Sequence, residues 1–142
     1  MMKMTATVQA NFDYESEADA ADKIRTAYGL CSIVTAMFAA SPLSEGRPNG
    51  YKSFRAAIWL ETDEDRCGLL PFVFAPGFSF RDYAEWALDI PMFFLVRDGR
   101  YLPVDALTFR QFIAEGFNGE TASLRDWEIH LSTLFPEVRL KH

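Results

Sequence analysis

The sequence predicts an α+β fold in which helices pack on a mainly antiparallel sheet. Apolar and polar residues alternate from Met2 to Asp13, which is typical of a strand with one buried face. The pair Asp98-Gly99 separates two apolar runs and is typical of a two-residue hairpin turn. Helical patterns lie between these strands without a regular strand-helix-strand alternation, which argues against a parallel sheet.

Length and composition favour one domain that covers residues 1–142. The hydrophobic content of 49% excludes a disordered chain. The net charge of -6 argues against broad contact with nucleic acid or an anionic membrane. We find no secretory signal and no apolar run of membrane-spanning length, and Cys31 and Cys67 lack metal-ligand spacing. We therefore expect a cytoplasmic protein with reduced cysteines.

The polar face of the opening strand has two interpretations. It carries hydroxyls, charges and the amides of Gln9 and Asn11 in one row. A strand at the sheet surface would turn this row towards water. Amides are poor strand formers, however, and they bind polar ligands well, so the row could also line a cleft that holds a ligand.

Helices are predicted wherever a capping residue precedes an apolar stripe. The first begins after Ser16, and Gly29 is expected to end or kink it before a second helical pattern over residues 30–40. Three further capped helices are predicted, after Ser79, Thr108 and Ser123. We place His130 on the surface of the last of these helices.

The remaining segments are predicted to be strands or loops. Residues 69–74 contain Pro71 and are expected to form an edge strand or an irregular segment. Residues 92–96 are expected to form a strand covered on both faces, and residues 100–104 should pair back on it.

The longest predicted loop, Ser41 to Ser53, is also the most basic part of the chain. It contains Arg47 and Lys52, and Arg55 follows directly. Long ordered loops in compact domains often carry function, but ordinary solvated charges explain this loop equally well. The acidic turn Asp63 to Asp65 could attract a divalent cation, although such turns are usually only solvated.

No phosphate loop, dinucleotide fingerprint, HExxH or GxSxG motif occurs. Three stretches nevertheless resemble the plant and proteobacterial type of glutamate-cysteine ligase: TATVQANFD from Thr5, ASPLSEGRPNGYKSFRAAIW from Ala40, and FPEVRLK from Phe135. The similarity continues through residues 63–74, 87–94 and 126–131 and so covers almost the whole chain. The chain resembles a central portion of the catalytic domain of a larger ligase.

This resemblance implies ATP-dependent joining of the γ-carboxylate of glutamate to the amine of cysteine, the first step of glutathione biosynthesis. It implies ATP and Mg²⁺ as cofactors, and an antiparallel sheet of the glutamine-synthetase type that curves around the active site. Family members are longer and carry metal-binding carboxylates beyond both ends of this chain. The chain alone is therefore expected to hold an incomplete metal site and to be an incomplete enzyme.

The resemblance also implies the site residues. Arg55 is the first candidate for gripping a carboxylate or phosphate, and Arg139 is the second, because phosphoryl transfer to a carboxylate needs cations around crowded negative oxygens. The resemblance implies roles for four more residues: Met2 and Ser53 in the amino-acid pocket, and Gln9 and Asn11 near the metal-bound nucleotide. We expect the two amides and Arg55 to face one hollow.

Two alternatives remain open. The chain could be a noncatalytic module, derived from the ligase, that binds an amino acid or nucleotide or serves in assembly. It could also be a folded scaffold that forms a homo-oligomer through exposed sheet edges.

Overall fold

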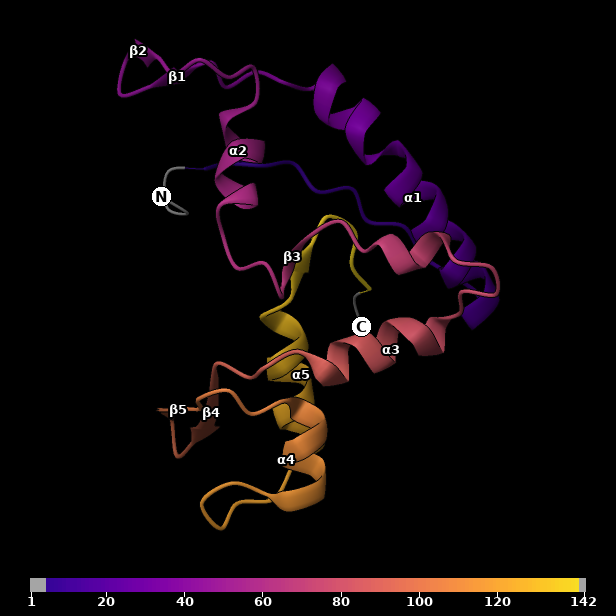
Figure 1. Ribbon diagram of the computed structural model, residues 1–142, viewed down its shortest axis with the longest axis vertical. Helices are drawn as coiled ribbons and strands as arrows, with labels where there is room; N and C mark the ends of the chain where they lie inside the picture. The colour runs from indigo at the N-terminus through magenta and orange to yellow at the C-terminus, as the bar shows by residue number, and fades with distance from the viewer. Residues whose placement is uncertain (1–4, 141–142) are drawn as a thin grey trace.

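The computed structural model describes residues 5–140 of the chain, so the prediction for Met2 lies outside the described residues. The molecule is elongated, with α1 at one end and the β4-β5 hairpin with α4 at the other (Figure 1). The helices are α1 (Glu17–Met37), α2 (Phe54–Leu60), the 3-10 helix η2 (Pro71–Phe74), α3 (Phe80–Asp89), α4 (Phe109–Glu115) and α5 (Leu124–Ser132). The strands are β1 (Leu43–Ser44), β2 (Arg47–Pro48), β3 (Cys67–Gly68), β4 (Phe94–Arg97), β5 (Arg100–Pro103) and β6 (Phe135–Pro136).

The α+β class is confirmed, but the sheet differs from the expected one. In the described part of the chain the strands form three separate two-stranded sheets rather than one large sheet. The β1-β2 and β4-β5 pairs are antiparallel, whereas β3 and β6 pair in parallel. The parallel pair joins two distant parts of the sequence, and it is central to the candidate site below.

The predicted opening strand is wrong for the residues that the structure describes. Residues 5–14 have no regular secondary structure, and most of them are exposed. Both faces of the segment are open, because Val8 and Phe12 are 97% and 76% exposed. A strand is stable only when its N–H and C=O groups pair with a neighbour, and none of the strands in residues 5–140 pairs with the segment.

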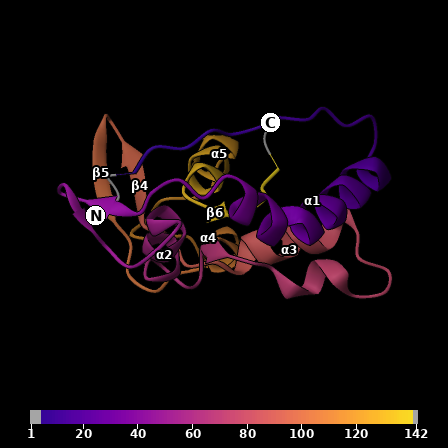
Figure 2. The ribbon, with the colours of Figure 1, turned by 90° about the horizontal axis from the view of Figure 1, so that it is seen from above.

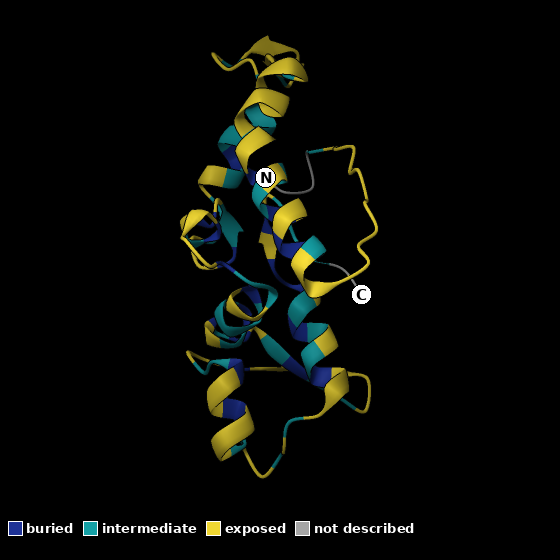
Figure 3. Ribbon diagram, turned by 90° about the vertical axis from the view of Figure 1, so that its right-hand side faces the viewer, coloured by how far each residue is buried: buried dark blue, intermediate teal, exposed yellow. Residues whose placement is uncertain are grey.

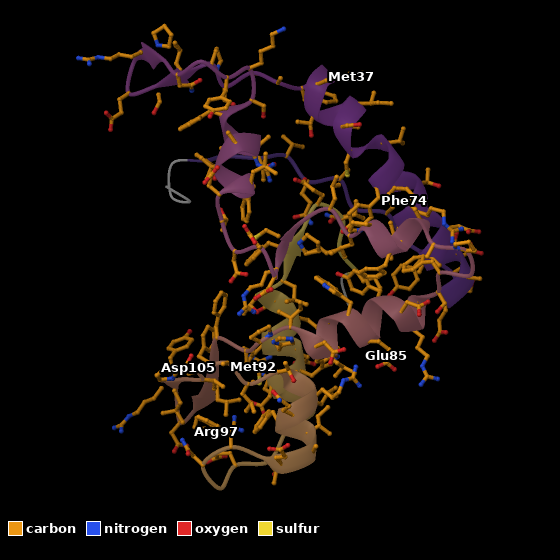
Figure 4. The ribbon with its side chains drawn as sticks, viewed as in Figure 1. Met37, Phe74, Glu85, Met92, Arg97 and Asp105 are labelled. Atoms are coloured by element: carbon orange, nitrogen blue, oxygen red, sulfur yellow. The ribbon has the colours of Figure 1, made fainter. Side chains whose placement is uncertain are left out.

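Helix α1 begins where the capping signal predicts and runs on past Gly29. The Ser16 hydroxyl accepts a hydrogen bond from the Asp19 N–H at 3.1 Å. Gly29 costs a helix interior only about 1 kcal/mol relative to alanine, so it does not end this helix of 21 residues. The apolar residues of the second predicted helical pattern, 30–40, are mostly exposed. Met37, labelled in Figure 4, lies at the outer end of α1. No helix in the described residues has both the length and the apolar character to cross a membrane.

The remaining local signals are largely confirmed. Capping boxes begin α3, α4 and α5, with the pairs Ser79-Asp82, Thr108-Gln111 and Ser123-Asp126. Asp98 and Gly99 both have positive φ and turn β4 back onto β5. Segment 69–74 takes the irregular alternative, because Pro71 begins η2. Strand β4 is covered less fully than expected, since only Leu95 of its residues is buried.

The apolar core consists of three clusters that follow each other along the long axis (Figure 3). The first joins the buried face of α1 to η2 and α3, and the second joins the β4-β5 hairpin to α4. Between them, Ala87 and Ile90 pack against Leu134, which links the end of α3 to the segment after α5. This middle cluster fixes where the chain enters β6.

The prediction that His130 lies on the helix surface is wrong. His130 is 3% exposed, its Nε2–H donates to the Ala87 carbonyl oxygen at 2.8 Å, and its ring stacks on Phe109 and Trp127. Burial lowers the pKa of the imidazole, although the hydrogen bond to Ala87 opposes this shift, and the nearby charge of Arg66 adds to it. The ring is therefore a neutral core group that links α5 to α3.

Asp126 is the other buried titratable group of α5. It is 3% exposed and accepts two hydrogen bonds from Arg97, at 2.6 and 3.2 Å, and two from Ser123. Arg97 lies on the hairpin at the lower end of the molecule (Figure 4) and also pairs with Glu120. Burial alone would raise the pKa of Asp126, but the hydrogen bonds from Arg97 and Ser123 outweigh it and hold the pKa below its usual value.

Replacing Asp126 with alanine should lower the free energy of unfolding by about 3 kcal/mol. This value is at the lower end of the range for a broken buried ion pair, because Arg97 still pairs with Glu120. The depressed pKa means that the Asp126 contribution is present above the unfolded-state pKa and is lost as pH falls through the folded-state pKa. Urea unfolding at pH 7 and at pH 3 measures both effects. Asp89→Ala, which removes an exposed pair with Arg110, is the control and should change stability far less. Equal losses in the two variants would contradict this account.

His130 predicts a second pH dependence. The unfolded chain binds a proton near pH 6.5, whereas the folded chain resists protonation, so the free energy of unfolding should decrease as pH falls from 7.5 to 5.5. His130→Gln should be less stable at pH 7.5 and should show a weaker decrease over this range. Thermal unfolding at the two pH values tests this expectation, and identical pH slopes for both proteins would refute it.

Candidate functional site

Helix α2 presents Arg55 in its first turn. The helix begins because the Ser53 hydroxyl accepts a hydrogen bond from the Ala56 N–H at 3.4 Å. The Arg55 N–H donates to the Ser41 hydroxyl at 3.4 Å, which ties the residues before β1 to the same helix start. Ser53, predicted to bind substrate, therefore uses its oxygen to cap the helix that carries Arg55.

The side chain of Arg55 lies over an aromatic ring one helical turn away. Its guanidinium carbon is 5.6 Å from the centroid of the Trp59 ring, within the range of a cation-π contact. Residues four apart on a helix lie on the same face, so α2 itself brings the two side chains together. Trp59 in turn is 5.8 Å from Phe135, centroid to centroid.

Phe135 comes from β6, near the other end of the chain. Its N–H donates to the Arg66 carbonyl oxygen at 2.9 Å, and β6 pairs in parallel with β3. Figures 1 and 2 show α2 close to this strand pair. Arg139 also lies over the Phe135 ring, with its guanidinium carbon 5.4 Å from the ring centroid. Its Nη1–H donates to the Leu134 carbonyl oxygen at 3.2 Å.

Arg55, Trp59, Phe135 and Arg139 thus form a continuous row, which we call the arginine-aromatic ladder. The two arginines predicted as catalytic therefore lie on one ladder, although 84 positions separate them in the sequence (139 minus 55). Sequence reasoning did not assign Trp59 and Phe135 to the site. The sequence pattern that could have pointed to Trp59 and Phe135 is the spacing of four residues between each of these aromatic residues and an arginine.

The ladder carries positive charge without an ion pair. Within residues 5–140, neither Arg55 nor Arg139 pairs with a carboxylate, and the same is true of Arg47 and Arg100. The other six arginines do pair with carboxylates: Arg25, Arg66, Arg81, Arg97, Arg110 and Arg125. Acidic residues outnumber lysine and arginine by 20 to 14, so the two ladder arginines remain uncompensated in an acidic protein. Such a pair is suited to binding an anion.

The structure does not bring the predicted amides into this row. Gln9 and Asn11 are exposed in the segment before α1, and no hydrogen bond joins them to Arg55 or Arg139 in the described region. That segment crosses α2 in Figure 1, but Figure 2 shows it apart from α2. The roles of Gln9, Asn11 and Met2 therefore stay predictions.

Two buried donors beside the ladder lack partners among the described residues. These are Trp59 Nε1 and Arg66 Nη1. Arg66 is 4% exposed, pairs with Asp63 at 2.9 Å, and stacks its guanidinium 3.4 Å from the centroid of Phe93. Asp63 thus serves this internal pair rather than a cation, and Arg66 was missed because its burial depends on contacts distant in sequence.

No metal centre accompanies the ladder. Residues 5–140 hold no cluster of three or more His, Cys, Asp or Glu side chains that could bind an ion. Two shallow surface hollows, one lined by residues between 72 and 86 and one by residues 112–121, do not involve the ladder. The ladder lies outside both of these hollows.

Comparison with known proteins identifies the family. The sequence profile of glutamate-cysteine ligase family 2 matches residues 1–142, the whole chain. The chain belongs to this family. The chloroplastic glutamate-cysteine ligases of Brassica juncea and Arabidopsis thaliana are each 51% identical to it over 144 residues, which is 99% of the chain. Ligase A of Oryza sativa subsp. japonica is 50% identical over the same share.

The chain matches only part of the length of these relatives. It spans 28% of the Brassica and Arabidopsis proteins and 29% of the rice protein. The expectation of a cytoplasmic protein is wrong, because these relatives are chloroplastic proteins. The absence of an evident signal in 142 residues was a poor guide to compartment.

Proposed function

We propose that this chain carries part of the substrate site of an ATP-dependent ligase that joins glutamate to cysteine. In this reaction an oxygen of the glutamate γ-carboxylate attacks the γ-phosphorus of ATP, which forms an acyl phosphate and releases ADP. The cysteine amine then attacks the acyl carbon, phosphate leaves, and the amine loses a proton. The observation that carries the proposal is the pair of uncompensated arginines in a chain about 50% identical to named ligases.

The ladder supplies the electrostatics that this chemistry needs. Every substrate of the reaction carries a carboxylate or phosphate group, and planar guanidinium groups bind such groups through two parallel hydrogen bonds. Arg55 is fixed by a capped helix and a ring face, and Arg139 by a carbonyl oxygen and a ring face. The two groups need little reorganisation to meet an anion, which favours tight binding.

The described residues do not fit a complete magnesium site. Mg²⁺ prefers hard oxygen ligands, and no acidic cluster of the required size occurs in residues 5–140. We therefore assign the magnesium ligands to parts of the longer relatives that this chain lacks. If this chain alone binds a substrate and does not turn it over, that result supports the second candidate function, a noncatalytic module that retains an amino-acid or nucleotide site.

The larger fold is part of the same proposal. The alternating segment before α1 is exposed on both faces, and the outer half of α1 exposes an apolar stripe that includes Ile33 and Met37. Both features suit a chain that normally packs against further protein. We propose that residues 5–13 become a strand of the curved antiparallel sheet, of the glutamine-synthetase type, in the full ligase.

Calorimetric titration of the chain with L-glutamate tests the proposal. Wild type should bind, and Arg55→Ala should weaken binding about tenfold or more, because a hydrogen-bonded charge pair contributes roughly 1.5–3 kcal/mol. Arg100→Ala is a matched control, since Arg100 is exposed on β5 and has no ion pair in the described region. With cysteine and MgATP added, no dipeptide should form. Absent binding, or equal weakening by both variants, would contradict a substrate site at Arg55.

Association of two copies through sheet edges is also still a proposal. All four residues of β5 are exposed, and residues 6–14 pair with none of the strands that the structure describes. We expect light scattering to show a dimer at high protein concentration. Val8→Pro, which removes a backbone donor in the exposed segment, should shift the mass towards the monomer. A strictly monomeric wild type would exclude this mode of assembly.

A further inference from the structure

Arg139 lies in a segment without regular secondary structure. Strand β6 ends at Pro136, and residues 137–140 belong to no helix or strand. The contacts of Arg139 with the Phe135 ring and the Leu134 carbonyl oxygen reach only a few residues back along the same segment. These local contacts place the guanidinium relative to β6, but they do not fix the surrounding backbone against the rest of the molecule.

The backbone just before Arg139 is held by a tyrosine of α1. The Tyr28 hydroxyl donates to the Val138 carbonyl oxygen at 2.9 Å, across 110 positions of sequence. Tyr28 is 3% exposed, and burial raises the pKa of its hydroxyl above the usual value, so the group keeps the proton that it donates. A buried hydrogen bond of this kind is costly to break, because its acceptor would be left unpaired away from water.

The backbone just after Arg139 meets a tyrosine of α3. Burial raises the pKa of Tyr83 to about 12, whereas a hydrogen bond with the Leu140 backbone and the charge of Arg139 both act in the opposite direction. Val138 and Leu140 also pack against the core cluster that contains both tyrosine rings. The residues on either side of Arg139 are therefore anchored to α1 and α3.

We propose that Tyr28 and Tyr83 are positioning residues, whose buried hydroxyls hold the backbone on either side of Arg139 and so fix where its guanidinium meets an anionic substrate. The role of the substrate rests on the proposed function, whereas the anchoring rests on the contacts of the two tyrosines. Neither hydroxyl needs to touch the substrate. Two-point binding of a carboxylate or phosphate depends on orientation, so an unanchored guanidinium would first have to be ordered, which weakens binding.

Tyrosine-to-phenylalanine variants test this proposal, because they remove a hydroxyl and keep the ring in the core cluster. In calorimetric titrations with L-glutamate, Tyr28→Phe and Tyr83→Phe should each weaken binding about two- to fivefold, the size expected for loss of one ordinary hydrogen bond. Tyr101→Phe is the matched control and should bind as wild type does, since Tyr101 lies on β5 and is 70% exposed.

A double-mutant cycle separates positioning from a general loss of stability. If the Tyr28 hydroxyl acts through Arg139, adding Tyr28→Phe to Arg139→Ala should weaken L-glutamate binding no further. An equal loss from Tyr28→Phe with and without the Arg139 guanidinium would overturn the proposal, because the hydroxyl would then act through another part of the protein.

A measurement without ligand separates this proposal from the proposed function. Backbone order parameters from NMR relaxation should fall at residues 138–140 in Tyr28→Phe, from about 0.85 towards 0.6, and should stay unchanged in α5 and in Tyr101→Phe. If wild type does not bind L-glutamate, the proposed function fails, and a local fall in these order parameters would still support the anchoring. Unchanged order parameters at residues 138–140 in both Tyr28→Phe and Tyr83→Phe would refute it.

Discussion

The parallel pairing of β3 with β6 is the constraint on which the candidate site depends. It brings Phe135, near the end of the described chain, beside the strand that follows α2. Trp59 then meets Phe135, and the two arginines come to lie on one ladder. The middle core cluster supports the pairing, because Leu134 is buried against α3 immediately before β6 begins. A short strand pair thus turns two distant segments into one surface.

The protein uses arginine in two different ways. Arg97 and Arg66 are paired with carboxylates and serve the fold, since their partners or they themselves are buried. Arg66 also lies over a ring, that of Phe93, but Arg55 and Arg139 combine a ring contact with the lack of an ion pair in the described residues, in a chain with a net charge of -6. Local positive charge in an acidic protein attracts small anions without attracting nucleic acid broadly. This division agrees with the anionic substrates of the ligases that the chain resembles.

Local features of the fold were predictable from sequence, and non-local ones were not. Capping boxes such as Ser79-Asp82, and the Asp98-Gly99 turn, depend on residues a few positions apart, so their patterns sufficed. The prediction of an opening strand failed because a strand depends on a partner strand, and residues 5–140 do not supply one. The prediction of a surface position for His130 failed because its burial depends on contacts with α3 and α4. The resemblance supplied Arg55 and Arg139, whereas their link through Trp59 and Phe135 required the fold.

The central claim is that Arg55 and Arg139 both belong to a site for anionic substrate. Calorimetric titration of L-glutamate into Arg55→Ala, Arg139→Ala and the exposed control Arg100→Ala tests this claim most directly. The account predicts that each of the first two variants binds L-glutamate about tenfold or more weakly than wild type, and that Arg100→Ala binds as wild type does. Wild-type affinity in Arg55→Ala and Arg139→Ala, or an equal loss in Arg100→Ala, would contradict the account.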